Sequence, residues 1–165
     1  MGNLFSASEA VQIGIQIEKN GRVFYAAVAA AALKKEVKTL FEHLAKEEEG
    51  HEKAFEHMLV SLRKTEPPES AREEYNAYLK DLAGEHVFIQ DGSGARMASG
   101  AENDAQALDL AIGFEKDSIA LFQKMKEWVP EWEQAAIDSL IAQEKDHLKT
   151  LTNVKMQGGS NDATA

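Results

Sequence analysis

The chain contains no cysteine and only three prolines among its 165 residues. The absence of cysteine excludes disulfide bonds, iron–sulfur clusters, thiolate zinc sites and cysteine nucleophiles. Proline is scarce while Ala, Glu, Leu and Lys are abundant, which favours an all-α fold. A chain of this length is sufficient for one domain with a substantial core.

Basic residues are also in the minority, since the formal net charge is −10. A sequence-independent nucleic-acid surface needs clustered Lys and Arg, so neither DNA nor RNA is an expected partner. No apolar run approaches the length of a bilayer span, and no signal-peptide pattern precedes the first helical pattern. We therefore expect no membrane partner and a cytoplasmic location.

Four long helical patterns dominate the chain. They are expected at about residues 8–33, 37–63, 102–128 and 130–156. Ser8 is the candidate N-cap of the first helix, and Pro130 suits the first turn of the fourth. Thr65-Glu66-Pro67-Pro68 ends the second helix. Helix length alone places a tight turn near Lys34–Glu36.

The segment between the second and third helices has a different composition. Residues 69–82 predict a shorter helix, while Asp91–Ala95 and Ser99-Gly100 predict a flexible loop. Two hairpins of long helices joined by one long crossover give the topology of a ferritin-like four-helix bundle. We expect residues 1–156 to form this domain and residues 157–165 to be a disordered tail.

The two hairpins resemble each other in sequence. Glu115 follows Glu18 by 97 positions, and Glu144 follows Glu48 by 96, so one register relates both halves to within a residue. The pairs that this register matches are Glu18 with Glu115, Tyr25 with Phe122, Glu48 with Glu144 and His51 with His147. Agreement of both offsets and of all the acidic and His positions is uncommon between unrelated helices.

Each long helix carries a carboxylate in the middle of its apolar stripe. The four residues are Glu18, Glu48, Glu115 and Glu144. A buried carboxylate is costly unless it is paired or binds a metal, and four in one core repel one another strongly. The stripes supply no Lys, and Arg22 is the only nearby Arg. A pair of divalent cations is the simplest way to neutralise the four charges.

The second and fourth helices each carry a histidine three residues after this glutamate, at His51 and His147. Glu and His at this spacing share a helix face and can reach one centre. Measured from the nearest helix turn, all six side chains lie roughly 18–25 Å along their helices, at 1.5 Å per residue. One such Glu-x-x-His pair alone favours an exposed surface pair. Two pairs, together with two matching glutamates, favour a metal site.

The pattern resembles the rubrerythrin family, within the larger group of ferritin-like di-iron carboxylate proteins. The resemblance covers about residues 8–156. It is carried by Glu18–Tyr25 (EKNGRVFY), Leu44–His51 (LAKEEEGH), Glu115 and Glu144–His147 (EKDH). It implies that Glu48 and Glu144 bridge two metal ions. The outer ligands would be Glu18 and His51 on one ion, and Glu115 and His147 on the other.

Two departures from the family pattern change the expectation. Full-length rubrerythrins carry a rubredoxin module with four cysteines, whereas this chain resembles the shorter relatives that need an external electron donor, such as a rubredoxin-like protein. Rubrerythrins also have an additional carboxylate three residues after the glutamate of the third helix. Ser118 stands there in this chain, and its repeat mate is Gly21. The remaining ligand set, four Glu and two His, is similar to that of ferritin-like oxidases.

The resemblance leaves three functions open. The first is a di-iron oxidoreductase that reduces hydrogen peroxide or dioxygen, in which iron or manganese is the working metal and zinc a possible substitute. The second is a ferroxidase or iron-handling protein, which oxidises ferrous iron and stores it or passes it on. The third is a non-enzymatic helical module stabilised by its metal. Relatives are commonly dimers, so a homodimer is expected.

Some residues near the proposed site have two interpretations. Tyr25 is a candidate catalytic residue that can bond a ligand carboxylate or quench a radical, or a core aromatic whose hydroxyl has found another partner. Glu85 and His86, in the crossover, either add a ligand or form a solvated pair. The acidic residues around Glu48, namely Glu47, Glu49 and Glu52, form a solvated face or a route for incoming cations. His43 and His57 lie off the metal face and are expected to be exposed.

Overall fold

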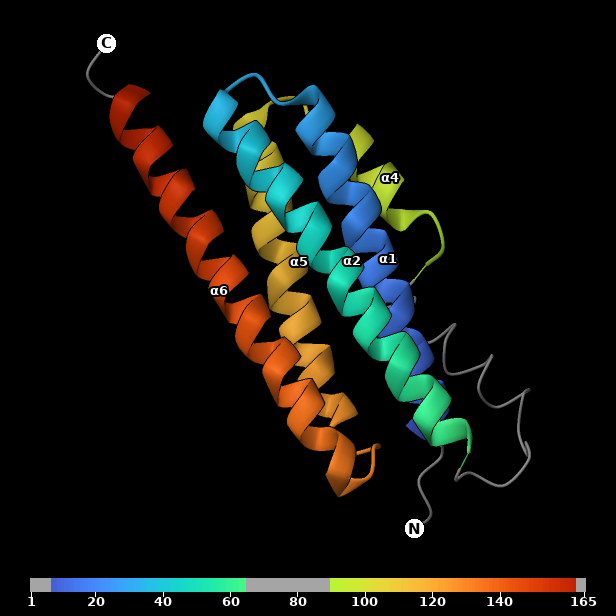
Figure 1. Ribbon diagram of the computed structural model, residues 1–165. Coiled ribbons are helices and arrows are strands. Elements are labelled where there is room, and N and C mark those ends of the chain that lie inside the picture. Colours follow the sequence, from blue (N-terminus) through green and yellow to red (C-terminus); the bar gives the residue numbers. More distant parts are fainter. Residues whose placement is uncertain (1–6, 65–89, 163–165) are drawn as a thin grey trace.

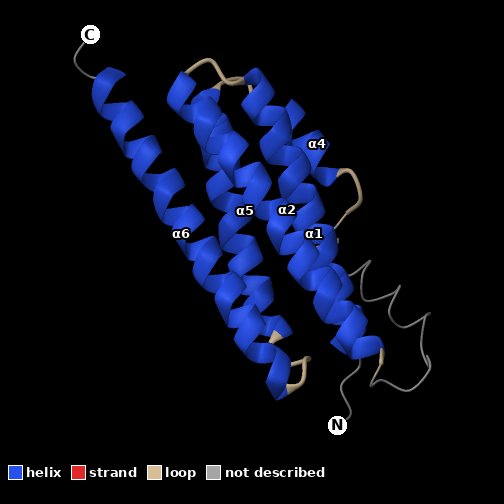
Figure 2. Cartoon of the chain, viewed as in Figure 1, coloured by secondary structure: helices blue, strands red, loops and turns tan. Residues whose placement is uncertain are grey.

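The computed structural model describes residues 7–64 and 90–162, and this part of the chain consists of helices joined by turns (Figures 1 and 2). The helices are α1 (Ala7–Ala31), α2 (Lys35–Arg63), α4 (Ser93–Ser99), α5 (Asp104–Met125) and α6 (Glu131–Asp162). The four long helices lie side by side as a bundle, and α4 lies against α1 (Figure 1). The all-α, ferritin-like bundle expected from the sequence is confirmed.

The turn between α1 and α2 contains neither Gly nor Pro, and a distant side chain secures it. The carboxylate of Asp104, at the start of α5, accepts hydrogen bonds from the backbone N–H groups of Leu33 (3.0 Å) and Lys34 (2.8 Å). Lys34 has extended backbone angles, which end the helical run. The turn expected near Lys34 is therefore present, and a contact with the second hairpin stabilises it.

The N-terminus of α1 differs from the sequence-based expectation, and the N-terminus of α5 has a cap that was not predicted from the sequence. α1 begins at Ala7, so Ser8 lies inside the helix and is not its N-cap. An N-cap residue needs non-helical backbone, and here the helical backbone already includes Ser8. At α5 the side chain of Asn103 caps the helix by accepting the backbone N–H of Gln106 at 3.0 Å.

The segment of residues 93–99 is a helix, so the flexible loop expected there is wrong. Asn20 on α1 donates its side-chain N–H to the carbonyl of Gln90 at 2.9 Å, just before α4 begins. Gly94 packs so closely on α1 that a Cβ atom at this position would overlap the carbonyl oxygen of Asn20. The glycine here allows close packing of two helices. The short helix expected at residues 69–82 lies outside the described residues.

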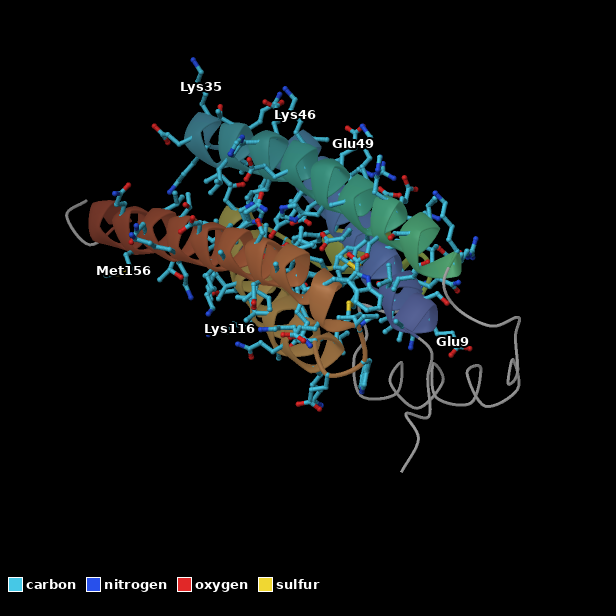
Figure 3. All side chains as sticks on the ribbon, turned by 60° about the horizontal axis from the view of Figure 1, so that its bottom comes forward. Glu9, Lys35, Lys46, Glu49, Lys116 and Met156 are labelled. Carbon is cyan, nitrogen blue, oxygen red and sulfur yellow. The ribbon has the colours of Figure 1, made fainter. Side chains whose placement is uncertain are left out.

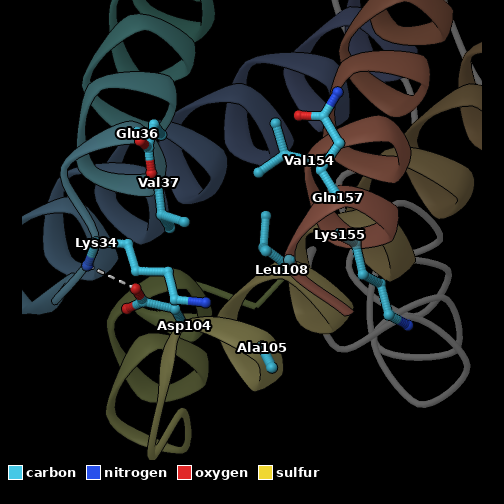
Figure 4. A pocket seen from close by; sticks show the side chains of 10 residues that line it. Lys34, Glu36, Val37, Asp104, Ala105, Leu108, Val154, Lys155 and Gln157 are labelled. Carbon is cyan, nitrogen blue, oxygen red and sulfur yellow. Dashed lines mark hydrogen bonds between the residues drawn. The ribbon is translucent and has the colours of Figure 1, made fainter. Parts of the chain in front are cut away.

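The last helix is longer than expected. α6 runs to Asp162, although the sequence predicts its end near Met156 and a tail without structure from residue 157. Glycine lowers helix stability by only about 1 kcal/mol per residue, and no proline follows to stop the helix. Residues 163–165 lie outside the described part of the chain. Near this end, α2, α5 and α6 surround a cavity of about 400 Å³ whose walls include Val37, Leu108 and Val154 (Figure 4).

The core runs along the middle of the bundle, and its largest members are aromatic. The ring side chains that are less than 2% exposed are Phe24, Tyr25, Phe41, Phe55, Phe114 and Phe122. On the outer side of the bundle, charged side chains such as Lys35, Lys46 and Glu49 of α2 point away from the core (Figure 3). None of the described helices combines the length and the apolar character needed to cross a membrane.

Candidate metal centre

All six residues proposed as metal ligands lie buried in the core of the bundle. The exposed fractions are 1% for Glu18, 0% for Glu48, 3% for His51, 0% for Glu115, 1% for Glu144 and 4% for His147. α1 and α5 each contribute one glutamate, while α2 and α6 each contribute a glutamate and a histidine. The 3.6-residue period explains this, because each residue lies on the apolar stripe of its helix.

The six side chains form two overlapping groups. The first group is Glu18, Glu48, His51 and Glu144, and the second is Glu48, Glu115, Glu144 and His147. Within each group, one ligand atom from every residue lies within 4.8 Å of the others. Glu48 and Glu144 belong to both groups, so the cluster consists of two half-sites with two shared carboxylates.

In the first half-site, the three carboxylates converge on Nδ1 of His51. This nitrogen lies 2.7 Å from Oε1 of Glu144, 3.5 Å from Oε2 of Glu48 and 3.6 Å from Oε2 of Glu18. Three different helices supply these oxygens. The half-site is therefore assembled only when both hairpins pack together.

The second half-site repeats this arrangement around Nδ1 of His147. This nitrogen lies 3.0 Å from Oε2 of Glu144, 3.5 Å from Oε1 of Glu115 and 3.6 Å from Oε1 of Glu48. Each shared carboxylate thus turns one oxygen to His51 and the other to His147. The imidazole rings are stacked, with centroids 5.4 Å apart and an interplanar angle of 16°. Two metal ions that shared the carboxylates of Glu48 and Glu144 would fit this arrangement.

Many of the converging atoms are unsatisfied, which fits metal ligands. Among the described residues, no partner with hydrogen-bond geometry is found for the following atoms: Oε1 of Glu18, both oxygens of Glu48 and Glu144, Oε2 of Glu115, and Nδ1 of His51 and His147. Buried polar groups are normally hydrogen-bonded, so this cluster of orphaned ligand atoms is a donor set that bound cations would satisfy. Arg22, the arginine nearest in sequence, donates to Oε2 of Glu52 at 2.9 Å and does not neutralise the cluster.

The electrostatics of the carboxyl groups show how costly four charges would be here. Burial, together with the nearby Glu48 and Glu144 carboxylates, raises the pKa of Glu18 well above its usual value. Burial and the Glu144 carboxylate do the same to the pKa of Glu115. Burial also opposes the ionisation of Glu48, but the adjacent Glu18 carboxyl and the two imidazoles outweigh it and lower the pKa of Glu48 to about 2. The metal-free cluster therefore contains both protonated and ionised carboxyls.

The imidazoles are the cations of the metal-free cluster. Burial lowers the pKa of His51, but the close carboxylates of Glu144, Glu18 and Glu48 outweigh burial and raise it overall. The pKa of His147 is raised in the same way, against burial, by Glu115, Glu144 and Glu48. Protons thus provide positive charge that metal ions would otherwise supply, and metal binding has to displace them.

Tyr25 contacts the cluster directly. Its hydroxyl donates a hydrogen bond to Oε1 of Glu115, and the side chain is fully buried between Phe41 and Phe114. Burial and the nearby Glu115 carboxylate raise the pKa of Tyr25, so the phenol stays protonated and acts as a donor. Of its two interpretations, the hydrogen bond to a candidate ligand is the one found. A catalytic role stays a prediction.

The outer nitrogens of both histidines have partners on the opposite ligand helix, which sequence reasoning missed. Nε2 of His147 lies 2.8 Å from Oε2 of Glu47, and Nε2 of His51 lies 3.3 Å from Oε1 of Gln143. Glu47 therefore does more than contribute to a solvated face. The internal repeat contained the signal, because Glu47 and Gln143 are 96 positions apart and each immediately precedes a shared glutamate.

A surface pocket of about 430 Å³ lies between α2 and α6 and reaches the cluster. Its lining includes His51, Glu47, Gln143 and Gly50, and its rim includes the exposed His43. A Cβ atom at Gly50 would meet no atom within 4 Å, so this part of the wall is open. Small molecules and ions thus have a path from solvent to the ring of His51.

The remaining predictions concern residues that belong to neither half-site. Ser118 is 3% exposed, and its hydroxyl has no partner among the described residues. Because this residue is a serine, the position offers the cluster no carboxylate. At its repeat mate Gly21, a Cβ atom would lie 2.7 Å from the ring of Phe114. Glu85 and His86 lie outside the described residues. His57 is exposed, as expected.

Comparison with known proteins bears on the family of the chain. The family model described as Rubrerythrin matches residues 9–155, a range that includes nearly all of the four long helices. No curated protein and no solved structure matches the chain. The match agrees with the resemblance drawn from the glutamate and histidine positions.

Proposed function

Because the chain belongs to the rubrerythrin family, we propose that it is a di-iron oxidoreductase that reduces hydrogen peroxide or dioxygen with electrons from an external donor. The observation that carries the proposal is the two-sided use of Glu48 and Glu144, whose four oxygens divide between two half-sites. A single-metal site has no need of this arrangement. The buried, orphaned ligand atoms support it further.

The chain's own residues would hold the two ions. Glu48 on α2 and Glu144 on α6 would be shared between them. The outer ligands would be Glu18 and His51 on one side, and Glu115 and His147 on the other. When bound, two iron ions supply the two electrons that convert one hydrogen peroxide and two protons into two waters.

The surroundings of the cluster limit which molecules reach it. Phe24, Phe41 and Phe114 pack around Tyr25 on one side and exclude water there. The Tyr25 hydroxyl donates to Glu115 and so holds one carboxylate oxygen in place. The pocket at His51 is open to small molecules such as peroxide and dioxygen. Since the chain has no cysteine, a rubredoxin-like partner or another external donor would return the electrons.

One observation favours a second candidate function, the oxidation and transfer of ferrous iron. Ser118 offers a hydroxyl where rubrerythrins have a further carboxylate, and this leaves the four-Glu, two-His set expected of ferritin-like oxidases. The acidic Glu47 beside the pocket would attract incoming cations. In this function iron is the substrate, and each chain would process many ions.

Anaerobic loading with ferrous iron tests the proposal. The metal-free protein is titrated to two irons per chain, peroxide and dioxygen are added separately, and absorbance is followed in a stopped-flow instrument. Fast oxidation by peroxide and slow oxidation by dioxygen is the expected result. Fast oxidation by dioxygen, with repeated turnover of added ferrous iron, would favour iron handling instead.

Zinc-loaded protein serves as the redox-inert control in the same experiment. If two irons bind and neither oxidant reacts with them, both redox functions are wrong. The metal-stabilised helical module would then be the remaining interpretation. Zinc should in that case replace iron without any loss of function.

A further inference from the structure

The two histidines of the cluster are held from outside by a crossed pair of residues, Glu47 and Gln143, here called the outer acceptors. Glu47 lies on α2 and meets His147 of α6, while Gln143 lies on α6 and meets His51 of α2. Each outer acceptor immediately precedes one of the shared glutamates. The contacts therefore tie the two hairpins together at the level of the cluster.

The geometry sets the direction of both hydrogen bonds once a metal is bound. Nδ1 of each histidine faces the carboxylates and is the nitrogen available to a metal ion. A neutral imidazole that binds a metal through Nδ1 carries its hydrogen on Nε2 and must donate there. The amide of Gln143 is oriented for this role, because its N–H group donates to the carbonyl of Ser139 at 3.3 Å, which turns its oxygen to His51.

The outer acceptors differ in charge although the repeat relates their positions. Glu47 offers a carboxylate oxygen at 2.8 Å, and Gln143 offers an amide oxygen at 3.3 Å. A hydrogen bond to an ionised acceptor is about twice as strong as one between neutral groups. It also increases electron donation by the ring to a metal, and loss of such a partner typically lowers metal affinity by about 10–100-fold.

We propose that Glu47 and Gln143 are positioning residues that make the two metal positions unequal, so that the position at His147 binds a divalent ion more tightly than the position at His51. The inference rests on the metal site of the proposed function but not on its redox chemistry. The first ion binds with Glu115 and His147. The second binds with Glu18 and His51, on the side where His51 lines the surface pocket.

Zinc titration of the metal-free protein tests this inequality without any redox step. Calorimetry of the unmodified chain should show two binding steps whose affinities differ by about 10–100-fold. NMR of the histidine side-chain nitrogens, recorded during the titration, should show the His147 signals shifting with the first equivalent and the His51 signals with the second. Two equal steps, or a first step at His51, would overturn the proposal.

Exchanging the outer acceptors provides the sharper comparison. Glu47→Gln should weaken the tight step by about 10–100-fold and bring the two affinities together, whereas Gln143→Glu should strengthen the weak step. The double exchange, Glu47→Gln with Gln143→Glu, should restore two unequal steps in reversed order, with His51 shifting first. A merely structural role of these residues would not reverse the order.

Glu49→Gln is the matched control. Glu49 lies on the same helix, is exposed and pairs with Lys53 at 2.6 Å, so its substitution removes the same charge without touching either histidine. Both zinc steps should be unchanged in this variant. If Glu49→Gln weakens zinc binding as much as Glu47→Gln, general charge attraction explains the effect and the proposal is wrong.

The outcomes separate this inference from the proposed function. Iron that binds but does not react with either oxidant contradicts the redox proposal and leaves the zinc results intact. Conversely, two zinc-binding steps of equal affinity contradict the inequality of the two positions. The redox proposal stands in that case if the iron-loaded protein reacts with peroxide or dioxygen.

Discussion

At the scale of the residue, the four core carboxylates differ in the number of half-sites they serve. Glu48 and Glu144 each place one carboxylate oxygen near His51 and the other near His147. Glu18 lies near His51 only. Ions that share two bridging ligands depend on each other for charge neutralisation. Loss of a shared ligand and loss of an outer ligand should therefore have different consequences.

Substituting Glu48 should abolish binding of both ions, whereas substituting Glu18 should leave one ion bound. Glutamine has the same shape without the charge, so Glu48→Gln and Glu18→Gln preserve packing. Elemental analysis after zinc loading and dialysis should find about zero and about one ion per chain, respectively. Glu52→Gln, which removes the partner of Arg22, is the control and should retain both ions. Two ions bound to Glu48→Gln would contradict the shared role.

At the scale of the element, α4 shows how a short helix is placed by one close contact. Asn20 is hydrogen-bonded to Gln90, and Gly94 packs on the backbone of α1 with no room for a side chain. These contacts lie two residues after Glu18, on the helix that carries this candidate ligand. The packing of α4 therefore stabilises the part of α1 that enters the cluster.

Gly94→Ala should destabilise the protein by about 1–3 kcal/mol, because the added methyl group forces α4 away from α1. The free energy of unfolding, measured by urea denaturation, checks this. Gly113→Ala is the matched control, since a Cβ atom at this helical glycine of α5 meets nothing within 4 Å. It should stabilise the protein by up to about 1 kcal/mol. Equal stabilities of the two variants would contradict the role given to Gly94.

At the scale of the whole molecule, the cluster joins two hairpins that pack more within themselves than against each other. Contacts are extensive between α1 and α2 and between α5 and α6, and sparse between α2 and α6. Yet Glu48 lies on α2 and Glu144 on α6, so bridged ions would connect the hairpins between two helices that have few direct contacts. Metal binding is therefore expected to stabilise the fold as well as to provide chemistry.

The stability of the metal-free protein should fall as pH rises. The pKa values of His51 and His147 are raised in the folded protein, so their contribution to stability is complete below the unfolded pKa and is lost as pH rises toward the folded pKa. The raised pKa values of Glu18 and Glu115 act in the same direction. The lowered pKa of Glu48, about 2, affects stability only under acidic conditions, below its unfolded pKa.

Thermal denaturation between about pH 6 and pH 9 measures this effect. With a chelator present, Tm should fall across this range, whereas zinc-loaded protein should have a higher Tm by an amount that grows with pH. Proton displacement on metal binding explains the second trend. A Tm of the chelated protein that rises with pH would contradict the account of the buried imidazoles. The Glu48→Gln variant is the control, because zinc should no longer raise its Tm.

The sequence by itself determined the helical class, the four long helices and the inward position of the six candidate ligands. The 3.6-residue period is a property of a single helix, so it shows which face is buried without any knowledge of the neighbouring helix. The internal repeat then related the two hairpins and predicted that Glu18 and Glu115 are equivalent, as are Glu48 and Glu144. Their role as metal ligands stays a prediction that the described experiments test.

Only the tertiary structure decided how these side chains meet. The crossed contacts of Glu47 and Gln143, the bond from Tyr25 to Glu115 and the close packing of Gly94 all join different helices. Each depends on the separation and rotation of two helices, which no pattern within one helix specifies. The sequence around Gly94 therefore predicts a loop, whereas Gly94 forms a packing contact with α1. Likewise, the sequence alone did not show that the carboxylate of Glu47 and the amide of Gln143 each lie beside a histidine of the cluster.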